Sequence, residues 1–242
     1  MIILACETST LLGSVAVLEN DRVLSCEESM RENSHSEVLN LFIEKALEKA
    51  GKKLSDVDLF VTGIGPGSFT GIRICLNTIK TLAYCFNKPV IGINSLQSLA
   101  AQAVAEEAQK HTSEFSNYPI ISMINAYKNM VYVASYKYQN EALIELKKPE
   151  VVRVQNLAEY ISEKSIICGD GYMTYEKYFP ESVKQNIIRF SEISDEPHAK
   201  TLGALASQMS QLKQDWNSLV PLYLRASEAE ENLKGIKYQH LF

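Results

Sequence analysis

The chain alternates short apolar runs with longer segments in which apolar residues recur at helical spacing. The first run, IILACE, is followed by the polar residues TST, which is typical of a buried strand. Two more runs flank Asn20-Asp21 and predict a hairpin, and the apolar stripe from Val38 to Leu47 predicts an amphipathic helix. Further along, the pattern predicts strands at 58–65 and 89–94 and helices at 70–86 and 95–109.

A similar order resumes in the second half, with strands, a hairpin and helices predicted at 120–126, 130–139, 142–152, 154–162, 165–171 and 201–214. The segments IILACETSTLLGSVAV and IISMINAYKNMVYVAS align without a gap, which places Glu7 opposite Asn125. Two unrelated α/β halves can look alike at this level. A repeated unit nevertheless predicts an α/β fold of duplicated ribonuclease-H-like halves with a cleft between them. We expect an N-terminal subdomain at 1–112 and a partly degenerate C-terminal one at 113–242.

Composition narrows the class of protein. The 242 residues carry a net charge of −5, and the longest runs of basic residues are the pairs Lys52–Lys53 and Lys147–Lys148, which argues against broad binding to nucleic acid. The five cysteines form no CxxC pair, and the apolar start is too short for a signal peptide. No apolar run approaches the ~20 residues needed to span a bilayer. We therefore expect a soluble, cytoplasmic protein with reduced cysteines and no membrane partner.

The stretch GIGPGSFTGIR, from Gly63 to Arg73, combines four glycines with a serine, a threonine and an arginine, which are residues that could bind an anion. Glycines at a helix start can turn backbone amides toward an anion, and Ser68 or Thr70 could cap the helix. The stretch lacks the Gly-Lys-Ser/Thr of a phosphate-binding loop, and Pro66 has no amide to donate. An anion cradle and a tight structural turn both stay open. The helix that follows is apolar on more than one side, so it is either buried or part of an interface.

The sequence contains few candidate catalytic residues. Glu7 with the hydroxyls of Thr8 and Thr10 could hold a hydrated Mg²⁺ and a phosphate, but a phosphoryl-transfer site needs more acidic groups than this. The four histidines include no HxxxH pair, and His198 is expected on the surface. No Gly-x-Ser-x-Gly elbow is present. We expect no catalytic residue and no metal site.

Several segments together resemble the bacterial TsaB (YeaZ) family, and the match is densest from Asp58 to Ala100. They are IILACETST, NSHSEVLNLFIEKAL, VTGIGPGSFTGIRICLNTIKTLAYCFNKPVIGINSLQSLA, PHAKTLGALA and PLYLR. The resemblance implies the ASKHA (actin-like ATPase) superfamily. It also implies a non-catalytic scaffold of the complex that forms threonylcarbamoyladenosine next to the tRNA anticodon. The implied partners are the catalytic paralogue TsaD and the ATPase TsaE, with a homodimer when TsaD is missing and tRNA bound only through the complex.

The resemblance also assigns tentative roles to residues. In this family, the helices that follow the first hairpin and the glycine loop bind TsaD. A partner interface is therefore expected at His35, Leu39, Phe42, Arg73, Leu76, Ile79 and Lys80. Leu39→Glu or Leu76→Glu is expected to abolish TsaD binding and leave the monomer folded. A vestigial nucleotide or anion site is expected at Glu7, Thr8, Ser9, Gly65, Gly67, Ser68 and Thr70.

The expected cofactor content is none, with a nucleotide only at the assembled interface. Glu7, Asn125 and Tyr127 depart from the family pattern of Asp, an acidic residue and Arg, and the metal-binding HxxxH of TsaD is reduced to His35.

Two other functions compete with the scaffold. The chain could be an independent ASKHA-type ATPase or a glycoprotease-like hydrolase, which requires Glu7, Thr8, Ser68 and Asp170 to converge on a nucleotide. Direct recognition of tRNA is the third possibility, and the acidic balance of the chain argues against it.

Overall fold

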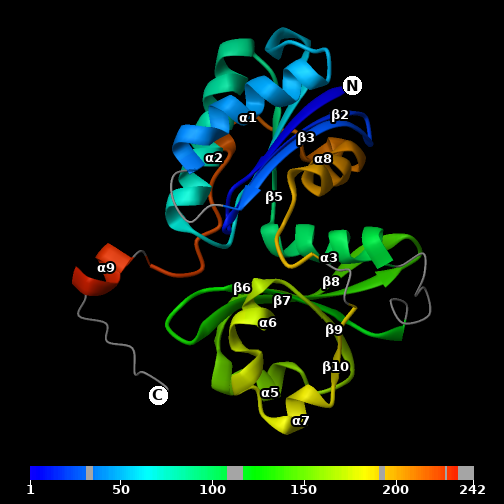
Figure 1. The fold of residues 1–242 in the computed structure, drawn as a ribbon, viewed down its shortest axis with the longest axis vertical. Coiled ribbons are helices and arrows are strands. Elements are labelled where there is room, and N and C mark those ends of the chain that lie inside the picture. Colours follow the sequence, from blue (N-terminus) through cyan, green and yellow to red (C-terminus); the bar gives the residue numbers. More distant parts are fainter. Residues whose placement is uncertain (31–34, 108–116, 191–193, 227, 234–242) are drawn as a thin grey trace. The chain divides into compact units, whose positions relative to one another are not determined.

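A computed structural model describes residues 1–30, 35–107, 117–190, 194–226 and 228–233. The chain divides into two compact units (Figure 1). The first unit consists of residues 1–98 together with 196–222, and the second of residues 99–195 together with 223–242. The first unit is therefore discontinuous in sequence. None of the helices among the described residues is long and apolar enough to cross a membrane.

The first unit is built on a five-stranded sheet with the order β3-β2-β1-β4-β5. The first three strands are antiparallel neighbours, and β4 and β5 run parallel to β1. Helices α1, α2 and α8 pack on this sheet, and α3 begins directly after β5. The bounds are β1 Ile2–Glu7, β2 Leu12–Glu19, β3 Arg22–Met30, α1 His35–Lys49, β4 Leu59–Gly63, α2 Phe69–Phe86, β5 Val90–Ile93, α3 Ser95–Glu107 and α8 Ala199–Gln208.

Both faces of the first sheet are buried. The side chains of Leu4 and Cys6 join the core under α1 and α2, while Ile3 and Ala5 join the core under α8. Figure 1 shows α1 with α2 and α8 on opposite sides of the strands. This alternation follows from the two-residue period of a strand, and it explains why β1 is apolar at every position before Glu7.

The second unit has the sheet order β8-β7-β6-β9-β10, which repeats the order of the first. Strands β6, β7 and β8 are antiparallel, and β9 and β10 run parallel to β6. Its elements are β6 Ile120–Asn125, β7 Met130–Gln139, β8 Ala142–Arg153, α5 Leu157–Tyr160, β9 Ser165–Cys168, α6 Asp170–Tyr175, α7 Glu181–Lys184, β10 Ile187–Ile188 and α9 Glu228–Leu233. The gapless alignment also holds, because Glu7 ends β1 and Asn125 ends β6. The predicted α/β fold of duplicated ribonuclease-H-like halves is confirmed.

The predicted subdomain boundary differs from this division. A boundary at residue 112 assigns the segment 196–222 to the second half, whereas in the structure α8 packs on the first sheet. The helix predicted at 201–214 is also too long. Helix α8 ends at Gln208, and the chain then returns to the sheet, where Gln214 exchanges two backbone hydrogen bonds with Val90 at the edge of β5. Tertiary pairing here overrides helix propensity.

A polar contact ties the start of α8 to strands β2 and β3. The Glu28 carboxylate accepts hydrogen bonds from His198 Nδ1 at 2.5 Å, Ser14 Oγ at 3.1 Å and Cys26 Sγ at 3.2 Å. Ser14 Oγ in turn accepts from the amide of Ala199 at 3.0 Å. His198 was expected on the surface, but only 13% of its side chain is exposed.

Glu28 makes this contact sensitive to pH. Partial burial opposes the charged form, but the hydrogen bond and charge of His198 outweigh it and lower the pKa of Glu28 to about 2. A carboxyl whose pKa is depressed on folding stabilises the fold above its unfolded value of 4.5. That contribution is lost as the pH falls from 4.5 toward 2.

We predict that Glu28→Gln lowers the free energy of unfolding at pH 7 by about 1–2 kcal/mol, a value reduced for partial solvent exposure. The wild-type chain loses stability between pH 4.5 and 2, and this part of the loss is absent in the variant. Urea denaturation across this pH range measures both effects, with the exposed Glu19→Gln as the control. Identical pH profiles for the wild type and Glu28→Gln would contradict the prediction.

Candidate functional site

Glu7, the last residue of β1, is fully buried in the first unit. Its carboxylate accepts hydrogen bonds from the Ser9 amide at 2.7 Å and from Ser95 Oγ at 3.1 Å. It also lies against Gly63, where an added Cβ would come within 2.1 Å of Oε2. Burial raises the pKa of Glu7, although these hydrogen bonds act in the opposite direction. The Glu7 carboxyl group is therefore buried and forms its hydrogen bonds with residues of the same unit.

The glycine loop packs directly on the backbone that follows Glu7. A Cβ at Gly67 would lie 2.2 Å from the Ser9 carbonyl oxygen, and a Cβ at Gly71 would lie 1.9 Å from that of Thr8. The Ser68 amide donates to the Ser9 carbonyl at 2.7 Å, and Thr8 Oγ1 donates to the Gly71 carbonyl at 2.7 Å. The glycines are thus required by close backbone approach.

Ser68 caps α2, because its hydroxyl accepts from the Gly71 amide. Gly65 is buried and precedes a cis peptide bond to Pro66, while Thr70 is exposed in the first turn of α2. The loop is a structural turn that joins β4 to α2 and holds the end of β1.

Two donors of the expected anion site are already bound within the chain. A phosphate dianion is held by several donors that point at it together. Here the Ser68 amide and the Thr8 hydroxyl bind the protein itself, and Glu7 would place a carboxyl group beside the anion. The Ser9 hydroxyl is buried beside the Glu7 carboxylate, and one hydroxyl does not make such a site.

The corresponding strand end in the second unit is also held by internal bonds. The Asn125 amide donates to Asp170 Oδ1 at 2.9 Å, and Asn125 Oδ1 accepts from the Tyr127 amide at 2.8 Å. Asp170 begins α6, so its carboxylate positions the end of β6. Tyr127 is mostly exposed in the β6–β7 turn with a positive φ of 55°.

Three of the residues expected at a partner interface are core residues. Leu39, Leu76 and Ile79 are 2%, 5% and 0% exposed, and all three belong to the apolar cluster between the helices and the sheet. The expectation that they form an exposed surface is wrong. The helical stripes that carry them face the sheet, because that is where the largest apolar area is buried.

The other expected interface residues lie in different environments. Arg73 is exposed, and its guanidinium lies 5.8 Å from the centre of the Phe69 ring. Phe42 is half-buried, and Lys80 donates to the Leu219 carbonyl at 3.0 Å. His35 begins α1, but its side chain lies outside the described residues.

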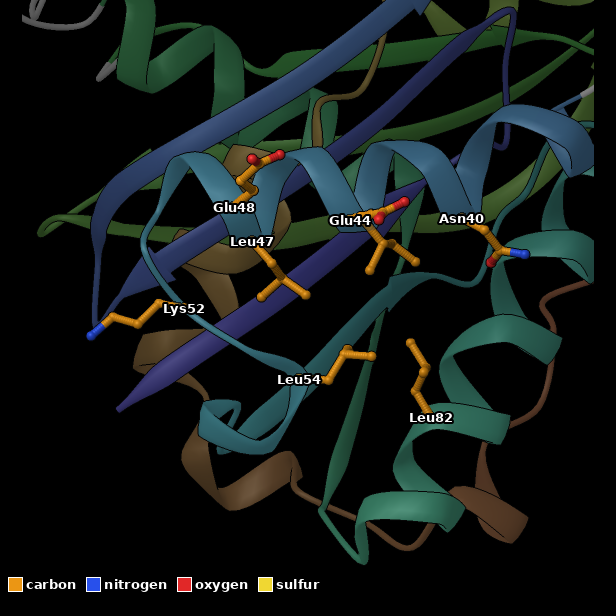
Figure 2. A pocket seen from close by; sticks show the side chains of 8 residues that line it. Asn40, Glu44, Leu47, Glu48, Lys52, Leu54 and Leu82 are labelled. Atoms are coloured by element: carbon orange, nitrogen blue, oxygen red, sulfur yellow. The ribbon is translucent and has the colours of Figure 1, made fainter.

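A groove lies between α1 and α2, and two of its lining residues, Ile43 and Leu47, belong to the core cluster under these helices. It has a volume of about 510 Å³ and lies between α1, the short helix η1 (Leu54–Asp56) and α2. Figure 2 shows the side chains of Leu47, Leu54 and Leu82 converging in it, with Glu44 and Glu48 along the α1 side. Its lining residues are Asn40, Ile43, Glu44, Leu47, Glu48, Lys52, Leu54 and Leu82.

The sequence contained a signal for this groove that motif reading missed. Ile43 and Leu47 are four residues apart on one stripe of α1, and Asn40, Glu44 and Glu48 form a polar stripe beside them. An apolar stripe next to a polar one marks the edge of a buried helix face. Leu54 and Leu82 could not be placed there from sequence, because they come from separate elements. Among the described residues, no group of three or more His, Cys, Asp or Glu side chains is arranged to hold a metal ion.

The two halves and their sheet order define the class of protein, a duplicated ribonuclease-H-like α/β protein of the ASKHA type. Residues 29–233 match the family model of TsaD, tRNA N6-adenosine threonylcarbamoyltransferase. The chain belongs to this family.

Individual relatives refine the match. The tRNA threonylcarbamoyladenosine biosynthesis protein TsaB of Bacillus subtilis is 26% identical over 233 residues, which cover 95% of this chain and 96% of the relative. A solved structure, an uncharacterized protein with similarity to peptidase YeaZ from Pseudomonas aeruginosa, is 27% identical with a TM-score of 0.78 and covers 93% of this chain and 99% of that chain.

The tRNA N6-adenosine threonylcarbamoyltransferase of Dictyoglomus turgidum is 48% identical over 63 residues, which are 26% of this chain and 19% of that protein. The expected resemblance to bacterial TsaB (YeaZ) is confirmed.

The buried Glu7 predicts a second pH effect, of opposite sign to that of Glu28. A carboxyl whose pKa is raised on folding costs stability as the pH rises above its unfolded value of 4.5. Glu7→Gln keeps the shape, and its amide oxygen can accept from the Ser9 amide while its NH2 group donates to Ser95 Oγ, which reverses the second bond. We therefore expect it to be close to the wild type in stability near pH 5 and more stable at higher pH.

Glu7→Ala is the matched comparison. It leaves the Ser9 amide and the Ser95 hydroxyl buried without their acceptor, at a cost of about 1–3 kcal/mol each. Thermal and urea unfolding of the three proteins from pH 5 to 8 measures these differences. A Glu7→Gln protein that loses as much stability as Glu7→Ala would show that the carboxylate itself is required.

Leu76→Glu is now expected to unfold the protein, because it places a carboxylate in the apolar core. We predict a loss of more than about 3 kcal/mol in the free energy of unfolding. The neighbouring Asn77→Glu, on the exposed side of α2, is expected to change it by less than about 0.5 kcal/mol. Urea denaturation compares the two, and a stable, folded Leu76→Glu monomer would contradict the assignment of this helix face.

Proposed function

We propose that this chain is a non-catalytic subunit of the complex that forms threonylcarbamoyladenosine in tRNA, and that it binds and activates TsaD. One observation carries the proposal: the chain matches a TsaB relative over nearly its whole length, but a transferase of the same family over only 19% of that protein. The chain therefore has the length of this TsaB relative, whereas it aligns with this transferase over 63 residues only.

The hydrogen bonds that the residues at the end of β1 form within the chain support a non-catalytic role. In this fold, chemistry on a phosphate would be expected at the end of β1, where Glu7, Thr8 and Ser9 lie. Their hydrogen bonds are made within the chain, and all three residues are at most 1% exposed. The proposal assigns no nucleotide or metal to this chain alone, and a nucleotide at the interface with TsaD stays a prediction.

The proposal places the partner on the outer surface of α1 and α2. The inner sides of these helices are occupied by the sheet, so a partner can reach only the opposite side. Phe42 and Arg73 remain candidates there, because neither is fully buried. TsaE joins through the complex, the chain pairs with itself when TsaD is missing, and the complex works in the cytoplasm, where its tRNA substrate is found.

The proposal predicts that tRNA modification requires this chain together with TsaD, TsaE and the threonylcarbamoyl donor. Product is expected only when the chain is present, and the chain alone is expected to turn over nothing. Equal product without the chain would overturn the proposal. Isothermal titration of the isolated chain with Mg-ATP separates the alternative: tight binding would favour an independent ATPase.

A further inference from the structure

A buried carboxylate in α9 fastens the end of the described chain to the turn between β6 and β7. Glu231 is only 2% exposed. Its Oε1 accepts hydrogen bonds from Arg225 Nε at 3.2 Å and Nη2 at 2.6 Å, and its Oε2 accepts one from Lys128 Nζ at 2.9 Å. Arg225 Nη1 also donates to the Ala126 carbonyl. The C-terminal segment is therefore tied to the turn at one side chain and at one backbone carbonyl.

The β6–β7 turn has a backbone conformation that is costly by itself. Tyr127, Lys128 and Asn129 have positive φ angles of 55°, 52° and 59°. Residues with a Cβ disfavour this left-handed region, and several in succession persist only where the surrounding structure holds them. Within the turn, the Ala126 amide donates to the Met130 carbonyl at 3.0 Å. The bonds of Arg225 and Glu231 to the turn add support from the other end of the second unit's sequence.

Helix α9 is held by charge rather than by an apolar face. Among its described side chains, Leu233 is 88% exposed and Glu230 is exposed, whereas Glu231 is buried. Its six residues are too few for a helix that is stable on its own in water. Loss of one partner from a buried ion pair is strongly destabilising, because the remaining charges stay buried without it. The attachment of α9 therefore depends on the Glu231 carboxylate, which Arg225 and Lys128 share.

We propose that α9 is a latch on the second unit, closed by Glu231 through Lys128 and Arg225. The closed latch keeps the β6–β7 turn in its left-handed conformation, with Tyr127 62% exposed in the turn. The open latch releases α9 and lets the turn relax, while the sheet of the second unit stays folded. An element with few buried apolar contacts opens locally at a lower cost in free energy than the core. All of these residues belong to the second unit, so the latch works in the isolated chain without a partner.

Hydrogen exchange of the purified full-length chain tests the closing group. Glu231→Gln keeps the shape of the side chain and removes its charge. We expect at least tenfold faster exchange in peptides that cover residues 126–130 and α9, because the two cations lose their shared anion. Peptides that cover β6 and β9 are expected to exchange within twofold of the wild type. Glu230→Gln removes a charge from the exposed neighbour in the same helix and is the matched control, expected to exchange like the wild type.

Trypsin provides an independent readout, because it cuts after Lys and Arg and must reach the side chains of Lys128 and Arg225. In the closed latch both side chains are bound to Glu231. Under native conditions we expect cleavage after these two residues to be at least fivefold faster in Glu231→Gln than in the wild type or Glu230→Gln. Mass spectrometry of the fragments over time measures the two rates.

Three results would overturn the latch. The first is exchange and cleavage in Glu231→Gln within twofold of the wild type. The second is faster exchange throughout the second unit, because α9 would then be part of its core and not an element that opens by itself. The third is faster exchange in α9 with no change in residues 126–130, because Glu231 would then attach the helix without holding the turn.

Discussion

Burial of β1 on both faces is the constraint on which the first unit depends. One side of this strand supplies the core under α1 and α2, and the other supplies the core under α8. Because the strand has no solvent-facing side, a polar residue can enter only at its end, and there it must find hydrogen-bond partners. Glu7 meets this condition through Ser9 and Ser95, and the glycine loop can approach closely only because it has no side chains at Gly63, Gly67 and Gly71.

The same packing directs where a ligand or partner can act. Among the described residues, the side chains at the end of β1 are buried and form hydrogen bonds within the chain. The cap at Ser68 fixes the start of α2, and its apolar residues then face the sheet. Between α1 and α2 lies a groove with an apolar floor and with the exposed residues Glu44 and Glu48 among those that line it.

Much of the fold could be predicted from the sequence, because strong periodicity and the gapless repeat are local signals. These signals predict the cap at Ser68 and the helix over 70–86. They also predict that Glu7 and Asn125 occupy equivalent positions at the strand ends of the two halves. The direction in which the buried side of a helix faces could not be predicted from the sequence. Because α2 is apolar on several sides, its sequence is compatible with a surface that includes Leu76 and Ile79, and only the position of the sheet shows which side is buried. Contacts between distant residues, such as Glu28 with His198 and Ser95 with Glu7, leave no periodic signal at all.

The discontinuity of the first unit has a consequence for its synthesis. Ser14 bonds to Ala199, a residue 185 positions later, so the face of the sheet that α8 covers is made long before its cover. Translation at about 5–20 residues per second needs on the order of ten seconds to produce the intervening residues 99–195. During that time Ile3, Ala5, Ala16 and Leu18 have no α8 to pack against, and their exposed apolar surface is a target for chaperones. Completion of the first unit is therefore a late event in translation, although the unit begins at the first residue.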